Sequence, residues 1–369
     1  MSPQQLEIQL IAAVVAASCA LVGSFLVLRR QAMLADAVSH AILPGIVLAF
    51  FWTESLRSPL LLVAAAATGV VAVFLIEALE RTRLVKTDAA IGLVFPALFA
   101  LGVVLVARYA SDVHLDTDAV LLGDPAFSWI ERFAPAGRDL GPLALWTMGG
   151  VLLLNLAFVV LFFKELKLAT FDPALAGALG FAPAALHYAL AGLVSVTAVG
   201  AFDVVGSILV VALMVAPPAG AYLLTDRLPR MVALAVLLGV LSAVLGYALA
   251  RALDASIAGS MATAAGALFV LCFALAPERG LLAQARRGTD QRREFARRML
   301  AVHLLHHERT ADADEECRVG HLQEHLSWSP TFAERAVRHA ERGGTVRRAG
   351  ERLLLTDAGR RYAQDAMVQ

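Results

Sequence analysis

The sequence predicts an all-α polytopic membrane protein followed by a small soluble domain. Of its 369 residues, 59% are apolar and only 17% are charged, and the mean hydropathy is +0.70. A soluble domain has about 45–50% apolar and about 25% charged residues. Apolar runs of about 20 residues, each long enough to cross about 30 Å of hydrocarbon, recur as far as Pro277. After Pro277 the composition changes abruptly to Arg, Glu and His. We therefore expect a membrane domain over residues 1–278 and a soluble domain over 279–369.

The apolar runs predict about eight or nine membrane-spanning helices. The candidates are Ile8–Leu28, Met33–Trp52, Pro59–Leu79, Asp88–Arg108, Pro142–Phe163, Ala184–Ala201, Val204–Leu224, Met231–Ala250 and Gly259–Ala276.

Basic residues gather in alternate connections between these runs, which the positive-inside rule places in the cytoplasm. They are Arg29, Arg30, Arg81, Arg83, Lys86, Lys164, Lys167, Arg227 and Arg230. The N-terminus then lies outside and the C-terminus inside.

The long connection from Ala110 to Gly141 carries several aspartates and is expected to be a solvated outer loop. Basic and acidic residues balance, 31 against 31, which argues against a general nucleic-acid coat protein.

Asp36 and His40 are the most informative residues of the membrane runs. In a helix they lie one turn apart, about 40° in azimuth and roughly 6 Å in rise, so both side chains face the same neighbour. A carboxylate in a membrane helix costs about 2.5–3.5 kcal/mol and usually lines a pathway or pairs with a partner. Carboxylate and imidazole together suit Mn²⁺, Fe²⁺ or Zn²⁺. Pro44 removes a helical hydrogen bond just beyond the pair. The residues alone also allow a buried structural pair between helices.

The segment "FLVLRRQAMLADAVSHAILPGIVLAF" resembles the signature of integral-membrane permeases of ABC transporters for manganese, zinc and iron. The resemblance extends from Leu10 to Pro277 and includes "VGSILVVALMVAPPAGAYLLTDRL". It implies that Asp36 and His40 line the metal pathway and its outer gate. It also implies a multi-pass protein of a prokaryotic plasma (inner) membrane. The transported ion would be Mn²⁺, Zn²⁺ or Fe²⁺, with manganese favoured, and no cofactor would be bound permanently.

The stretch "ELKLATFDPALAGALGFAP" contains a short helix that is too short and too polar to span. From the residues alone it is an interfacial connector. The family resemblance implies that it is the coupling helix, which sits in a cleft of the ATPase subunit. The residues assigned to this contact are Phe171, Asp172, Pro173, Leu175, Leu179 and Gly180.

The chain contains no G-x-x-x-x-G-K-[ST] motif, so the sequence indicates no ATP site and no enzymatic activity of its own. ATP hydrolysis is expected on a separate ATPase subunit. The resemblance further implies an extracytoplasmic metal-binding protein and a second permease, either another copy or a homologue.

The soluble domain shows the element order of a winged helix-turn-helix. We expect a helix over Gln291–His307 with Phe295, Met299, Val302 and His306 on its apolar stripe, and a shorter one over Gly320–Leu326. Ser329 and Pro330 begin another helix that ends at Gly343. A hairpin over Thr345–Arg348 and Arg352–Leu355 follows, and Thr356 and Asp357 cap a last helix.

The segment "LQEHLSWSPTFAERAVRHAERGGTVRRAGERLLLTDAGRRYA" resembles the DNA-binding half of iron- or manganese-dependent repressors. Glu334 and Glu341 mix with Arg335, Arg338 and Arg342 on the helix that would contact DNA, which argues against DNA as a partner. The alternative function is a membrane-bound metal-responsive transcription regulator, which would have no use for the coupling segment.

Histidines in the tail recur at the spacing of one helical turn. His303 and His307 form one such pair, and His321 and His325 form another, with Glu315, Glu316 and Cys317 between them. Two residues one turn apart on a helix can hold one ion. They predict a second metal site, although surface histidines on amphipathic helices would give the same spacing.

Overall fold

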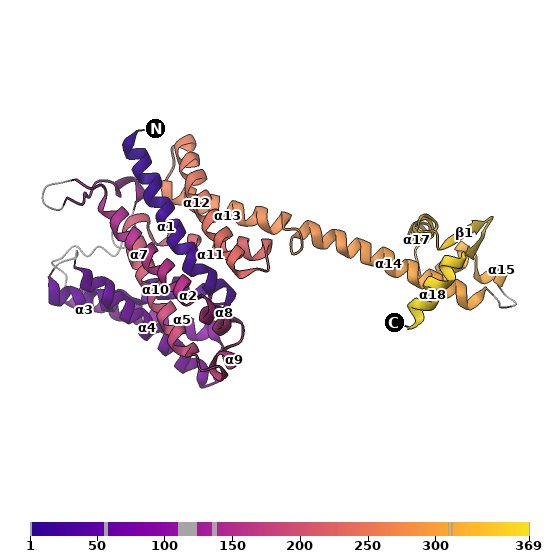
Figure 1. Ribbon diagram of the computed structural model, residues 1–369, viewed down its shortest axis with the longest axis horizontal. Coiled ribbons are helices and arrows are strands. Elements are labelled where there is room, and N and C mark those ends of the chain that lie inside the picture. The colour runs from indigo at the N-terminus through magenta and orange to yellow at the C-terminus, as the bar shows by residue number, and fades with distance from the viewer. Residues whose placement is uncertain are drawn as a thin grey trace. The chain divides into compact units, whose positions relative to one another are not determined.

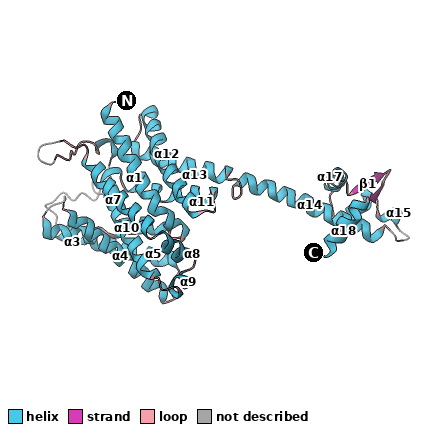
Figure 2. Cartoon of the chain, in the orientation of Figure 1, coloured by secondary structure: helices cyan, strands magenta, loops and turns pink. Residues whose placement is uncertain are grey.

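The computed structural model describes residues 2–54, 58–109, 124–134, 139–308, 310 and 313–368. Most of the predicted outer loop between Ala110 and Gly141 lies outside these residues. The chain divides into two units, Met1–Gly280 and Leu281–Gln369, which are described separately below. Helices dominate both units, and the strands among the described residues all belong to the second (Figures 1 and 2).

The described part of the first unit contains nine segments long and apolar enough to cross a membrane, which confirms the predicted polytopic fold. One of them, residues 32–53, consists of two helices. The helices of these segments are α1 (Pro3–Leu28), α2 (Ala32–Ala41) with α3 (Leu43–Thr53), α4 (Pro59–Arg81), α5 (Thr87–Tyr109), α7 (Leu143–Leu161), α10 (Pro183–Val205), α11 (Ser207–Leu224), α12 (Leu228–Leu253) and α13 (Ile257–Leu275).

One interruption divides a run that the sequence predicted as continuous, and a second shifts a predicted boundary. The helix after His40 stops at Ile42 and restarts at once, because the Ile42 carbonyl accepts hydrogen bonds from both Gly45 and Ile46 while Pro44 has no N–H to donate. Farther along, Gly206 has a φ of +81°, a conformation that only glycine adopts without strain. It separates α10 from α11, two residues later than the boundary predicted at Val204.

The helices of this unit pack in two groups. In the first, α1 lies against α11 and α12, and α13 packs on both of these (Figure 1). Gly23 allows this close approach, since a Cβ there would lie 2.1 Å from the Met214 carbonyl oxygen. In the second group α2, α3, α4 and α5 pack together, and α10 covers α4.

A buried amide connects three of the long helices. Asn155 on α7 donates from Nδ2 to Ser18 Oγ on α1 at 3.0 Å and to Thr197 Oγ1 on α10 at 2.8 Å. All three residues are fully buried. Such hydrogen bonds between helices stabilise a membrane bundle by about 0.6 kcal/mol each on average.

Three short elements connect the long helices. They are the 3₁₀ helix η1 (Pro125–Phe127) and the helices α8 (Phe163–Phe171) and α9 (Pro173–Ala178). α8 follows α7 directly, and α9 packs on α8 and on the start of α10.

The second unit has its own apolar core, built from residues such as Leu300, Leu304, Leu322, Val337 and Leu353. Strands β1 and β2 pair antiparallel, with Val346 opposite Leu355 and Ala349 opposite Arg352. The elements are α14 (Leu281–His307), α15 (Ala313–Glu316), α16 (Val319–His325), α17 (Pro330–Arg342), β1 (Val346–Ala349), β2 (Arg352–Leu355) and α18 (Asp357–Val368).

The predicted apolar stripe of the first tail helix is wrong. Phe295 is 65% exposed and His306 is also exposed, whereas Leu300, Leu304 and His303 are buried. Both sets repeat at helical spacing, and the set that includes the two leucines faces the core of the second unit. α14 also begins ten residues before the predicted start at Gln291.

The charges of α17 separate onto two sides. Glu334 Oε2 lies 3.1 Å from Nη2 of Arg348 in the hairpin, and Glu341 Oε1 lies 3.8 Å from Nε of the same arginine. Arg335, Arg338 and Arg342 instead line a groove between α17 and α14. The mixed face expected from the sequence is therefore resolved into an ion-paired side and an arginine-lined side.

Candidate functional site

Asp36 and His40 lie together on α2, as their spacing predicted. His40 Nε2 is 3.6 Å from Asp36 Oδ1, and the side chains are 24% and 44% exposed respectively. The His40 ring also lies beside two aromatic rings of α5, with centroids 5.7 Å from Phe95 and 6.0 Å from Phe99. Both side chains of the pair are partly accessible in the described chain.

The rest of α2 explains why the pair faces outward. Leu34, Ala35, Val38 and Ala41 are nearly or fully buried against neighbouring helices. Met33 is 62% exposed and shares its side of the helix with Asp36 and His40, because residues at i, i+3 and i+7 lie close in azimuth. The packed face fixes α2 against the neighbouring helices, and the opposite face presents the carboxylate of Asp36 and the imidazole of His40.

The predicted coupling residues form an exposed apolar surface around α9. Asp172 caps this helix by accepting a hydrogen bond from Leu175 N at 2.9 Å. Ala176 anchors it in a small core with Ala169 and Leu186. The large apolar side chains point away from that core: Phe171 is 61%, Leu175 46% and Leu179 61% exposed.

Gly180 ends this segment in a left-handed conformation, with a φ of +86°. Its N–H donates to the Gly177 carbonyl, and Phe181 N donates to the Ala176 carbonyl at 3.0 Å. The turn closes the segment from Pro173 to Gly180 directly after α9.

A polar network that the sequence did not predict lies behind this surface. Arg29 at the end of α1 donates to Thr170 Oγ1 on α8 at 3.3 Å and to His187 Nδ1 on α10 at 2.9 Å. The other ring nitrogen of His187, Nε2, lies 3.1 Å from Glu77 Oε1 on α4. Because arginine only donates, His187 Nδ1 must accept, and its proton is on the nitrogen that faces Glu77. Burial lowers the pKa of the Arg29 guanidinium.

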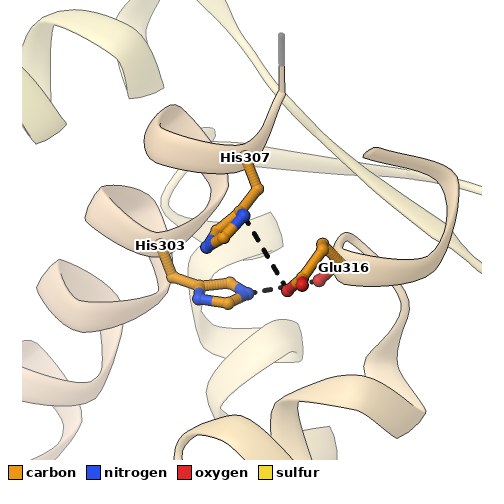
Figure 3. A group of neighbouring side chains, drawn as sticks. All are labelled: His303, His307 and Glu316. Carbon is orange, nitrogen blue, oxygen red and sulfur yellow. Dashed lines mark hydrogen bonds and ion pairs between the residues drawn. The ribbon is translucent and has the colours of Figure 1, made fainter. Parts of the chain in front are cut away.

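The structure brings together three of the four predicted tail histidines. His303 and His307 on α14 converge with Glu316 of α15 (Figure 3). His321 Nε2 lies 2.8 Å from Glu316 Oε2. The side chain of His325 lies outside the described part of the chain. Glu316, which the sequence indicates only as one of the residues between the two histidine pairs, lies at the centre of this cluster.

The comparisons with known proteins identify the family of this chain. The profile of the ABC 3 transport family matches residues 5–276. TroD, a zinc transport system membrane protein of Treponema pallidum, is 48% identical over 97% of this chain and 98% of its own length. MntD, a manganese transport system membrane protein of Bacillus subtilis, is 45% identical over 76% of this chain and 95% of its own.

A solved structure supports the same assignment. PsaBC of Streptococcus pneumoniae, determined in complex with a Fab, matches with a TM-score of 0.62 and 28% identity, over 76% of this chain and 94% of that one. This chain therefore belongs to the ABC 3 transport family, as a multi-pass membrane permease. The match to TroD also includes most of the second unit, because it covers 97% of the chain. Nothing in these matches favours the alternative of a transcription regulator.

Proposed function

We propose that this chain is the permease subunit of an ATP-driven importer of divalent transition metal ions, with Mn²⁺ or Zn²⁺ as cargo. The observation that carries the proposal is the pairing of Asp36 with His40 on the open side of an interrupted membrane helix. Oxygen and nitrogen donors of this kind bind both ions, and the relatives named above transport one or the other.

The exposure of Asp36 supports a role in the ion pathway. A carboxylate that is 44% exposed within a membrane segment cannot face lipid without a cost of several kcal/mol. The open face of α2 then lies against water or a second chain. A second permease copy, or a homologous permease, would close the pathway across this face, and Asp36 and His40 would replace part of the hydration shell of the ion at the outer gate.

The surface formed by Phe171, Leu175 and Leu179 is proposed to contact a separate ATPase subunit. Exposed apolar side chains on a small capped helix suit a groove in a partner protein. The Arg29–His187–Glu77 network connects α8, on which α9 packs, to α1, α4 and α10. A displacement of α9 would therefore be passed to these long helices. ATP would be hydrolysed on that partner, and an extracytoplasmic metal-binding protein would deliver the ion.

The topology proposed from the basic connections places α8, α9 and the second unit in the cytoplasm. On this assignment residues 1–278 are the permease domain of a prokaryotic inner-membrane protein. The second unit would be a cytoplasmic winged-helix domain with a regulatory or protein-contact role, supported by the order of α16, α17, β1, β2 and α18.

Reconstitution tests this function. The chain would be placed in proteoliposomes with the ATPase encoded by a neighbouring reading frame and the matching metal-binding protein, and ⁵⁴Mn²⁺ and ⁶⁵Zn²⁺ accumulation would be followed with and without ATP. ATP-dependent accumulation of at least one ion is expected. Vesicles that lack the ATPase are the control, and equal accumulation in both would refute an ATP-driven permease.

A further inference from the structure

The cluster at the end of α14 has the donor arrangement of a metal site. One donor atom from each of His303, His307 and Glu316 lies within 4.8 Å of the other two. His307 Nδ1 is 3.8 Å from Glu316 Oε2, and His303 Nε2 is 3.2 Å from the Glu316 backbone oxygen (Figure 3). In tetrahedral zinc sites the ligands stand about 3.3 Å apart, since Zn–N distances are about 2.0–2.1 Å. Small side-chain rotations would therefore bring the three donors into range.

The surroundings of the cluster suit an ion better than a solvated group of histidines. His303 is only 8% exposed, and the side chains of His307, Glu316 and His321 are 19–20% exposed. The centroids of the His303 and His307 rings are 4.7 Å apart. A divalent cation binds imidazole nitrogens and a carboxylate oxygen at the same time, so the convergence of two imidazoles on one carboxylate in this half-buried place suits an ion.

We infer that His303, His307 and Glu316 form a zinc-binding site in the second unit, with His321 holding the Glu316 carboxylate in place. Two imidazoles and one carboxylate leave a fourth position for water and match the donor preferences of Zn²⁺. Mn²⁺ prefers oxygen-rich, six-coordinate sites and should bind here much more weakly. The inference is independent of the transport function, because it uses no residue of the Asp36–His40 pair.

Metal binding at this site would also restrain the position of the β1–β2 hairpin. Glu316 ends α15, and the next residue, Cys317, accepts a hydrogen bond from Leu353 N of β2 at 2.8 Å through its backbone oxygen. Arg352 of β2 also forms an ion pair with Asp314 of α15. A metal that ties α15 to α14 would therefore fix the hairpin relative to the first helix of the unit.

The test uses the full-length protein in detergent micelles, in both the wild-type and the Asp36→Asn background, so that zinc held at the membrane pair is counted separately. Bound zinc is measured by mass spectrometry after dialysis against chelator-buffered Zn²⁺. Glu316→Gln and His307→Gln remove donors with little change in size. His306→Gln is the matched control, since His306 is exposed and lies outside the donor set.

We expect Glu316→Gln and His307→Gln to lose one zinc per chain, and His306→Gln to retain it. His321→Gln should keep the site with about tenfold weaker affinity, as is usual for a residue that orients a ligand. Hydrogen exchange of α14 and α18 peptides reports whether each variant remains folded. Wild-type zinc content in folded Glu316→Gln and His307→Gln would overturn the site, and displacement of zinc by equimolar Mn²⁺ would overturn the zinc preference.

Discussion

Gly23 of α1 lies directly against the backbone of Met214 on α11, and a Cβ at residue 23 would stand 2.1 Å from the Met214 carbonyl oxygen. Backbone atoms cannot rotate away as a side chain does. The two helices would therefore have to separate to admit even a methyl group.

Gly23→Ala is accordingly expected to destabilise the bundle by about 1–3 kcal/mol, the usual cost of overpacking. The measurement is thermal unfolding of the purified protein in detergent. Gly150→Ala on α7 is the control, because no atom lies within 4 Å of the added Cβ and alanine has the higher helix propensity. Unchanged stability of Gly23→Ala would mean that the α1–α11 contact is looser than described.

Asp36→Asn and His40→Gln should each lower ATP-dependent metal uptake at least about tenfold, since even the loss of a residue that orients a metal ligand costs about 10–100-fold. Both changes preserve size, so insertion and ATPase binding should be retained. Met33→Leu changes an exposed apolar residue on the same side of α2 and should transport normally. Normal uptake by both polar variants would exclude the pair from the pathway, and loss of the protein from the membrane would support a structural pair instead.

Leu175→Glu and Leu179→Glu should weaken the contact with the ATPase. Burying a leucine contributes about 1.5–3 kcal/mol, so each change is expected to reduce ATPase co-purification roughly tenfold or more and to uncouple transport. Leu140→Glu is the matched control: Leu140 is 48% exposed, close to the 46% of Leu175, but precedes α7 at the opposite end of that helix from α8. An intact, transporting complex with both variants would place the contact elsewhere.

The second unit should lose stability in acid through Glu294. The Tyr362 hydroxyl donates to this carboxylate and, with Arg297 and Arg298 nearby, lowers the pKa of Glu294 below its ordinary value of 4.5. A lowered folded-state pKa stabilises the fold above the unfolded pKa, and this contribution disappears as the pH falls through the lower folded value.

Hydrogen exchange of α14 and α18 peptides, measured in the intact protein between pH 6 and about pH 3, should therefore show increasing exposure below about pH 4.5. Tyr362→Phe removes the hydroxyl and should flatten this dependence while leaving the peptides protected at pH 6. The same steep acid response in Tyr362→Phe would show that other carboxylates dominate.

Membrane spans were predictable because an apolar run of about 20 residues has few alternatives to a helix in a bilayer. The pairing of Asp36 with His40 was predictable for a similar reason, since helical spacing alone brings them together. The start of α9 is equally local, because aspartate is a preferred cap directly before a proline at the first helical position.

The remaining features depend on contacts between segments far apart in the sequence. Arg29 and His187 are 158 residues apart, and no local pattern connects them. Glu316 became the centre of the tail cluster only because the chain turns back after α14. The apolar stripe of α14 was misassigned because two sets of residues share its spacing, and the choice between them depends on what packs against the helix.

The position of Asp36 and His40 beside the interruption between α2 and α3 has an electrical consequence for the proposed ion pathway. His40 lies near the middle of the segment 32–53, so on the proposed pathway an ion held there would have crossed about half of the hydrocarbon core. At a membrane potential of 100 mV, negative inside, each elementary charge gains about 2.3 kcal/mol over the full thickness. A divalent ion that moves inward to this depth would gain about that amount from the electric field alone. Arrival at the pair should therefore be voltage-dependent, and a polarised membrane would concentrate the cation at the gate before any ATP is hydrolysed.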